Sequence, residues 1–255
     1  MSVPDSVSPA TPTVVLLHGA FADSSGWNGV IERLTAAGVQ ARAVSNPLRG
    51  ISADTAYVAS ALAQVPGPVL AVGHSYGGAV LTNAAAQAGN VIGLVYVAAF
   101  APDEGELLID IENGSTDSVL NTALVEGKYP VGEETVGEFS IDTTKFHEVF
   151  AADLPAEQAA LMAATQRPVS ALGFVEPNGT PAWKTLPSWA VVATGDHAAG
   201  SDVVRSMAQR AGAVITEVEG SHVIMISQPQ AVADVVLRAL DMLAQSPADR
   251  AASSM

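Results

Sequence analysis

The sequence predicts an α/β protein, built on a mainly parallel sheet of about six strands with helices on both faces and an inserted cap. From Thr13 onward, apolar runs of strand length alternate with segments of helical periodicity. Strands that are separated by helices pair in parallel, because each helix carries the chain back across the sheet. The alternation is interrupted once, by a stretch too long to be a loop in a compact domain. We therefore expect one core carrying one insertion.

The strands are predicted from short apolar segments rich in β-branched residues. The first one, Thr13–Gly19, is rich in β-formers and continuously apolar over residues 14–17, which is typical of a strand buried on both faces. The expected strands span residues 13–19, 39–45, 68–74, 91–100, 189–194 and 213–219.

The helices are predicted between these strands from their apolar periodicity. They span residues 31–37, 53–64, 77–88, 203–211 and 229–244. For the last helix we expect Ser227 as the N-cap and Pro229 in the first turn, where proline is well tolerated.

The insertion divides the predicted core into two parts. We expect the core at residues 11–100 and 186–247, the cap segment at 101–185, and flexible tails at 1–10 and 248–255. The cap segment is acidic and rich in Gly and Thr to about Asp142, and it then becomes helical at 146–152 and 155–165.

Composition excludes several classes of function. The chain of 255 residues has no cysteine, which rules out disulfides, thiolate metal sites and a cysteine nucleophile. Its formal charge of -15 would repel a nucleic acid. No apolar run reaches the roughly 18 to 20 residues that span a bilayer, and the first twelve residues lack the parts of a secretory signal. We expect a cytoplasmic monomer or homodimer that binds neither nucleic acid nor a membrane.

The nucleophile is predicted at Ser75, in the pentapeptide Gly73-His74-Ser75-Tyr76-Gly77. This G-x-S-x-G pattern lies between a buried strand and a helix, where the chain must turn sharply and the neighbouring glycines leave room for the turn. The turn exposes the serine hydroxyl and directs the Tyr76 N–H toward an oxyanion on the substrate.

His222 is the predicted general base, because it follows the last strand and precedes the last helix, from where its loop can reach Ser75. We expect the other histidines to have other roles. His18 should form structural hydrogen bonds beside the site, His74 should point inward, His147 lies in the cap segment, and His197 should be exposed.

Asp196 is the predicted acid of the triad, since it directly follows the fifth strand and gives the chain order Ser, Asp, His. An orienting carboxylate fixes the tautomer of the base. Asp103, after the fourth strand, is the rival candidate, and Asp202 is expected to cap a helix.

A second oxyanion donor is expected in the loop after the first strand. Gly19 allows close approach there, and the Ala20 N–H is the first candidate, with Phe21 the second. Trp27 is interpreted as a packing anchor for the first helix. The predicted substrate-binding residues are Phe21, Phe146, Phe150 and Val223, although apolar residues at helical spacing more often form core than pocket.

Together, these motifs resemble enzymes of the α/β-hydrolase fold, most closely the branch of plant methylesterases and hydroxynitrile lyases with their bacterial relatives. The resemblance rests on the segments 16–20, 73–78, 98–104, 195–196 and 220–229, and it covers about residues 13–244, weakly in the cap segment. It implies Ser75, Asp196 and His222 as the triad, and an oxyanion hole near Ala20 and Tyr76. The expected activity is hydrolysis of small to medium apolar carboxylic esters, without cofactor or metal.

Three alternatives remain open at this stage. A lyase of this branch would carry threonine at Gly19 and lysine after the catalytic histidine, where this chain has Val223. A cofactor-free peroxidase or dioxygenase could use the same fold. A non-catalytic receptor could retain the triad and bind its ligand tightly.

Overall fold

The computed structural model describes residues 11–245. The tails expected at 1–10 and 248–255 lie outside the described residues. Within 11–245, no helix is long and apolar enough to cross a membrane.

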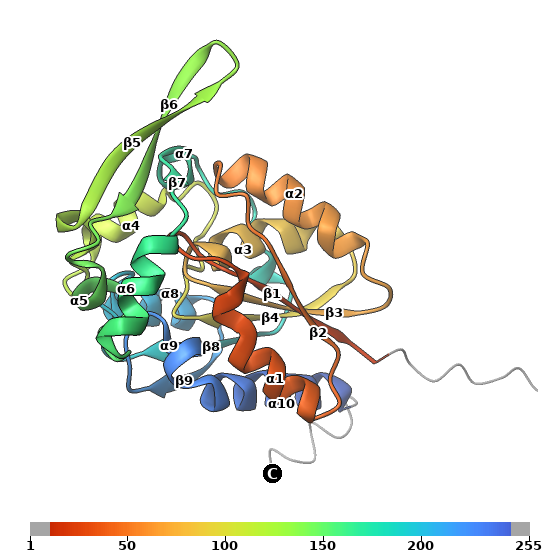
Figure 1. The fold of residues 1–255 in the computed structure, drawn as a ribbon. Helices are drawn as coiled ribbons and strands as arrows, with labels where there is room; N and C mark the ends of the chain where they lie inside the picture. Colours follow the sequence, from red (N-terminus) through yellow and green to blue (C-terminus); the bar gives the residue numbers. More distant parts are fainter. Residues whose placement is uncertain (1–10, 246–255) are drawn as a thin grey trace, which may run out of the picture.

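A six-stranded parallel sheet forms the centre of the molecule (Figure 1), with the strand order β2-β1-β3-β4-β8-β9. Strands β1, β3 and β8 are buried along their whole length, whereas the edge strands β2 and β9 are partly exposed. This confirms the predicted sheet. The strands are β1 Thr13–Leu17, β2 Ala41–Val44, β3 Val69–His74, β4 Val91–Val97, β8 Ser188–Ala193 and β9 Val214–Val218.

Helices cover both faces of the sheet (Figure 1). Helices α1 and α10 pack together on one face, and α2 and α3 pack together on the other. The main helices of the core are α1 Asn28–Ala36, α2 Ile51–Ala63, α3 Tyr76–Ala88, α8 Ser201–Arg210 and α10 Pro229–Ala244, with a 3-10 turn, η1, at Ser24–Trp27.

The predicted bounds of α10 are confirmed, but its predicted N-cap is wrong. Ser227 does not cap α10, because it is the last residue of a separate short helix, α9 Ile224–Ser227. Gln228 occupies the N-cap position and makes no side-chain hydrogen bond there, while Pro229 lies in the first turn as expected.

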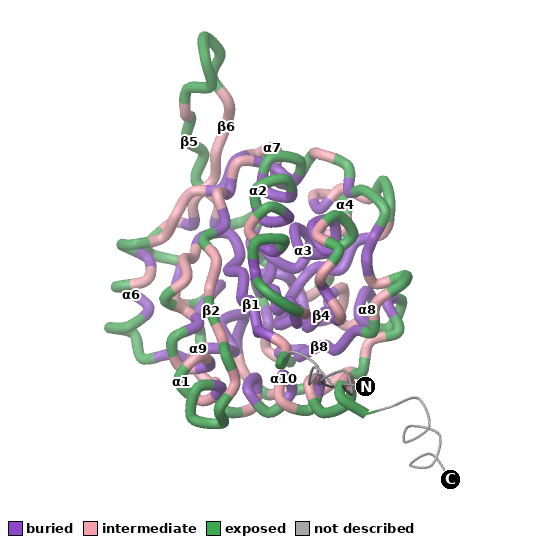
Figure 2. The backbone as a smooth tube through the Cα atoms, turned by 90° about the vertical axis from the view of Figure 1, so that its right-hand side faces the viewer, coloured by how far each residue is buried: buried purple, intermediate pink, exposed green. Residues whose placement is uncertain are grey.

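The cap segment contains a β-hairpin that the sequence did not predict. Strands β5 Leu124–Val131 and β6 Glu134–Ile141 pair antiparallel, and β6 also pairs with β7 Val169–Ser170. The hairpin projects from the body of the molecule and is exposed over much of its length (Figure 2). Gly, Pro and Glu are depleted in strands, and their presence here hid the pattern.

The rest of the cap segment is helical and lies close to the body of the molecule. Its elements are α4 Leu108–Gly114, η2 Leu120–Thr122, α5 Phe146–Phe150, α6 Ala156–Thr165, α7 Leu172–Val175 and η3 Ala182–Lys184. Helices α5 and α6 correspond to the two predicted at 146–152 and 155–165.

The end of β1 packs directly against the first turn of α3, and Gly77 makes this contact possible. A Cβ atom added at Gly77 would lie 2.7 Å from the His18 carbonyl oxygen and 2.8 Å from that of Leu17. Since both neighbours are backbone atoms in the buried core, neither can move without disturbing β1.

We therefore expect Gly77→Ala to lower the free energy of unfolding by about 1–3 kcal/mol, the usual cost of overpacking a core. Gly114→Ala is the matched control, because an added Cβ there meets nothing within 4 Å. Urea denaturation measures both variants. Equal midpoints for the two would contradict the tight contact.

Candidate active site

Ser75 lies at the turn between β3 and α3 with a strained backbone. Its φ of 52° and ψ of -127° are unusual for a residue with a side chain. The Gly78 N–H and the Phe100 N–H both donate to the Ser75 carbonyl oxygen, at 2.9 and 3.2 Å. The surrounding backbone thus holds the strained residue in place.

His222 and Asp196 form a buried hydrogen-bonded pair. The His222 Nδ1–H donates to Asp196 Oδ2 at 2.8 Å, and both side chains are 1% exposed. The other carboxylate oxygen accepts the N–H groups of Ala198 and Ala199, each at 2.9 Å. Because a carboxylate oxygen can only accept here, Nδ1 carries the proton and Nε2 is left as the acceptor of the ring.

His74 holds the backbone of His222 in place. The sequence predicted only that the His74 side chain points into the protein. Its Nε2–H donates to the His222 carbonyl oxygen at 3.0 Å, and the two ring centroids are 4.6 Å apart. Burial, followed by the charge of nearby His222, holds the pKa of His74 well below its usual value. A neutral His74 therefore fixes the backbone of the base without adding a charge.

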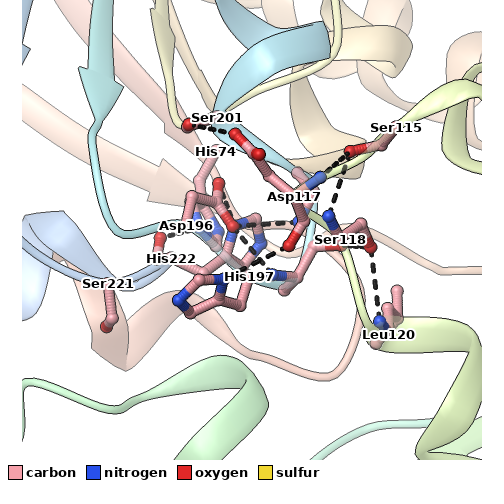
Figure 3. A network of polar contacts seen from close by, with 12 residues as sticks. His74, Ser115, Asp117, Ser118, Leu120, Asp196, His197, Ser201, Ser221 and His222 are labelled. Atoms are coloured by element: carbon pink, nitrogen blue, oxygen red, sulfur yellow. Dashed lines mark hydrogen bonds and ion pairs between the residues drawn. The ribbon is translucent and has the colours of Figure 1, made fainter.

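A polar network binds the cap segment to the loop that carries Asp196 (Figure 3). The carboxylate of Asp117 accepts the Ser201 hydroxyl at 2.6 Å, and its carbonyl oxygen accepts the exposed His197 ring at 3.2 Å. Asp202 accepts the Ser115 hydroxyl at 2.6 Å. This corrects the expectation that Asp202 caps a helix, since the N-cap of α8 is Gly200.

A second contact binds the cap segment to the loop of the base. Asp153, between α5 and α6, accepts the Ser221 N–H at 3.0 Å and also accepts the Ser221 hydroxyl. Because Ser221 directly precedes His222, the cap segment contacts the loop of His222 as well as that of Asp196.

The other candidates from the sequence lie outside this pair. Asp103 is at the surface and forms an ion pair with Lys184 at 2.6 Å, so it does not orient His222. His18 accepts the Asn46 N–H at 2.9 Å, and burial lowers its pKa to about 4. His147 donates to the Leu154 carbonyl oxygen at 2.9 Å within the cap segment.

A small cavity brings Ser75 and His222 together with the predicted oxyanion donors Ala20 and Tyr76. Its volume is about 20 Å³, room for about one water molecule. The remaining walls are apolar and come from Phe21, Phe100, Leu108, Leu120, Phe150, Phe174, Ala198 and Ala199.

Three of the four predicted substrate-binding residues line one of two neighbouring spaces, and the fourth lines neither. Phe21 and Phe150 line the cavity, and Val223 lines a larger neighbouring pocket. Phe146 lines neither, because it is buried behind Phe150 with a ring-centroid distance of 4.9 Å. Phe150 itself packs on the His222 ring, with centroids 4.9 Å apart.

Glu112 of α4 is a buried acid that the sequence did not single out. Burial, only partly offset by its hydrogen bond with Ser118, raises the pKa of Glu112 to about 8. The Ser118 hydroxyl has a single hydrogen, and both the Glu112 carboxyl and the Ala198 carbonyl oxygen lie within hydrogen-bond distance of it. A protonated Glu112 satisfies both contacts, because it donates to Ser118 while Ser118 donates to Ala198.

The described residues contain no group of three or more histidine and acidic side chains placed to hold a metal ion. The structure thus brings together a strained serine and a buried histidine–carboxylate pair, with Ser75 and His222 lining one largely apolar cavity.

Comparison with known proteins gives a family and a set of structural relatives. A model of the alpha/beta hydrolase family matches residues 14–235. No protein with a curated description matches the chain.

Solved structures with the same fold include several hydrolases. Polyneuridine aldehyde esterase has a TM-score of 0.76 at 20% identity, covering 90% of this chain and 99% of its own. A pyrethroid hydrolase from Sphingobium faniae JZ-2 has a TM-score of 0.73 at 22% identity, covering 94% and 99%. The methylesterase MES16 from Arabidopsis has a TM-score of 0.73 at 18% identity, covering 91% and 99%. At this level of identity the likeness concerns the fold.

The raised pKa of Glu112 makes the stability of the protein depend on pH. An unfolded chain releases this proton near the usual value of 4.5, whereas the folded protein retains it to about 8. The free energy of unfolding should therefore fall as pH rises through this interval and stay at the lower level above it. Each unit of pKa difference corresponds to about 1.4 kcal/mol.

We expect Glu112→Gln to be more stable than the wild type by a few kcal/mol near pH 8, and by little near pH 4.5. Urea denaturation at these two pH values measures the difference. Glu148→Gln, at an exposed position on α5, is the control and should show no such pH-dependent gain. A gain for Glu112→Gln that is the same at both pH values would contradict a protonated Glu112.

Proposed function

The chain belongs to the alpha/beta hydrolase family, and from this premise we propose that it is a serine hydrolase. It cleaves carboxylic esters of small to medium apolar substrates through an acyl-enzyme on Ser75. The observation that carries the proposal is the buried His222–Asp196 pair, 2.8 Å apart, whose histidine shares a cavity with the strained Ser75. Esterases and a hydrolase among the structural relatives agree with it.

The first half of the reaction forms the acyl-enzyme. His222 Nε2 takes the Ser75 proton as the serine oxygen attacks the ester carbonyl carbon. The negative charge on the carbonyl oxygen is stabilised by the N–H groups of Ala20 and Tyr76. When the carbon–oxygen bond to the alcohol breaks, His222 gives its proton to the departing alcohol oxygen.

The second half releases the acid. A water molecule replaces the alcohol, gives a proton to His222 and attacks the acyl carbon. The bond to Ser75 then breaks, and the serine oxygen recovers the proton from His222. Asp196 holds the histidine in the required tautomer throughout, and its position is fixed by the two N–H groups of the following loop.

The cavity walls favour apolar substrates. Phe100, Leu108, Leu120 and Phe174 surround the space beside Ser75, and burying apolar groups there is favourable while an uncompensated charge is costly. We propose that the cap segment, which supplies three of these four residues, selects the substrate.

A lyase on the same triad is disfavoured, because there is no room at Gly19 for a side chain. A Cβ atom added there would lie 2.6 Å from the Ser75 Cβ and 2.9 Å from the His74 carbonyl oxygen. The threonine expected of such lyases would not fit at this position without a shift of the nucleophile.

Ser75→Ala and His222→Ala should each lower kcat/KM for short p-nitrophenyl esters by at least about 10³-fold, because each removes a member of the nucleophilic unit. The measurement is release of nitrophenol, with a burst expected from the wild type. Ser60→Ala, on the exposed face of α2, is the control and should keep full activity. An inert wild type, or full activity in Ser75→Ala, would refute the hydrolase proposal.

Asp196→Asn should lower kcat by about 10⁴-fold with the same substrates, because an amide in place of the carboxylate favours the wrong tautomer of His222. Asp103→Asn removes a carboxylate of the surface ion pair with Lys184 and should leave kcat unchanged. If the two variants lost activity to the same extent, Asp196 would not be the orienting acid.

A further inference from the structure

A second pocket adjoins the active-site cavity, and Phe21 lines both. The outer pocket has a volume of about 320 Å³, whereas the inner cavity beside Ser75 has about 20 Å³. Ligand pockets usually begin at about 300 Å³. The outer pocket is therefore large enough for a ring-sized group, whereas the inner cavity is far smaller.

Phe21 stands between the two spaces in a strained conformation. Its φ is 58°, which is a genuine outlier for a bulky residue. Its ring meets that of Phe150 edge-on, with centroids 6.2 Å apart, and the residue is 3% exposed. Strain of this kind persists only where the surroundings enforce it, and it concentrates at functional sites.

The chemistry of ester cleavage decides which part of a substrate each space receives. His222 must return its proton to the oxygen of the departing alcohol, so the alcohol lies on the His222 side of the carbonyl. Val223 directly follows His222, and Val223, Met225 and Ile226 all line the outer pocket.

The inner cavity is lined by Ser75 and His222 themselves, and its other walls come from a different part of the molecule than those of the outer pocket, apart from Phe21. Its walls include Phe100, after β4, and Leu108, Leu120 and Phe174 from the cap segment. These residues are apolar and leave little space, which suits a short acyl chain.

The lining of the outer pocket is mixed in character. Met162 and Met225 contribute apolar side chains, while Asp23 and Gln158 supply polar groups; the amide of Gln166, which also lines the pocket, is hydrogen-bonded to the backbone of Ile141 and Ala163. An alcohol with an apolar ring and one or more hydrogen-bonding groups matches this lining, whereas a purely aliphatic chain would leave the polar groups unused.

We propose that the outer pocket is the binding site for the alcohol part of the substrate, and that the Phe21 ring is the gate between this pocket and Ser75. The substrates are then esters of a short apolar acid with a larger, partly polar alcohol. This inference rests on the proposed hydrolase function and adds the division of the substrate between the two spaces.

The test compares Phe21→Ala with Phe174→Ala. The second variant also removes one phenyl ring, but from a wall of the inner cavity alone. Two ester series are used: acetates of ethanol, benzyl alcohol and 1-naphthol, and p-nitrophenyl esters of acids from acetate to octanoate. Phe21→Ala should raise the kcat/KM ratio of naphthyl to ethyl acetate by about 10-fold or more, the usual effect of relieving a steric block. Phe174→Ala should instead extend the acyl range.

Met162→Trp provides a second variant in case Phe21→Ala does not fold. It fills the outer pocket from α6 and should lower the naphthyl-to-ethyl acetate ratio by about 10-fold, because the larger alcohol loses its space.

The outcomes distinguish the two levels of the proposal. Suppose that hydrolysis depends on Ser75 but that the naphthyl-to-ethyl acetate ratio of kcat/KM is unchanged in both Phe21→Ala and Met162→Trp. This result overturns the assignment of the outer pocket and leaves the hydrolase function standing. A wider acyl range in Phe21→Ala also overturns it. If no ester in either series is cleaved in a Ser75-dependent way, the hydrolase function fails, and the pocket assignment fails with it.

Discussion

The close packing of β1 and β3 against the start of α3 is the constraint on which the site depends. Ser75 keeps its strained backbone because the neighbouring backbone groups are tightly packed and cannot move. These groups can approach so closely because Gly19 and Gly77 have no side chains. The strain is a local cost that the buried sheet offsets. As a result, Ser75 and the two predicted oxyanion donors, Ala20 and Tyr76, all line one small cavity.

The base and the acid are held from two directions, and the cap segment takes part in both. The sheet supplies the loops after β8 and β9, while Asp117 and Asp153 of the cap segment bind the residues beside Asp196 and His222. Buried histidines contribute as neutral groups: low pKa values keep His18 and His74 uncharged, so each acts through hydrogen bonds of fixed direction. Keeping these neighbours neutral avoids the desolvation cost of further buried charges.

The sequence predicted what local patterns encode. The G-x-S-x-G turn, the strand ends that carry Asp196 and His222, and the parallel sheet all follow from spacing along the chain. It did not predict features that depend on distant partners. Asp202 was expected to serve its own helix, yet it binds Ser115, 87 positions away in the chain. The burial of Glu112 and the division between two pockets arise only when the cap segment packs on the core.

The same contacts determine how a substrate can reach Ser75. The inner cavity is too small to admit an ester as it stands, so some part of its wall must move. Lifting the whole cap segment would break the hydrogen bonds of Asp153 with Ser221 and of Asp117 with Ser201, and would release the loops that position the base and the acid. A rotation of the Phe21 ring breaks neither of these hydrogen bonds and alters only its edge-on contact with Phe150. Under the proposed mechanism, entry past Phe21 would therefore keep His222 and Asp196 paired while the substrate arrives.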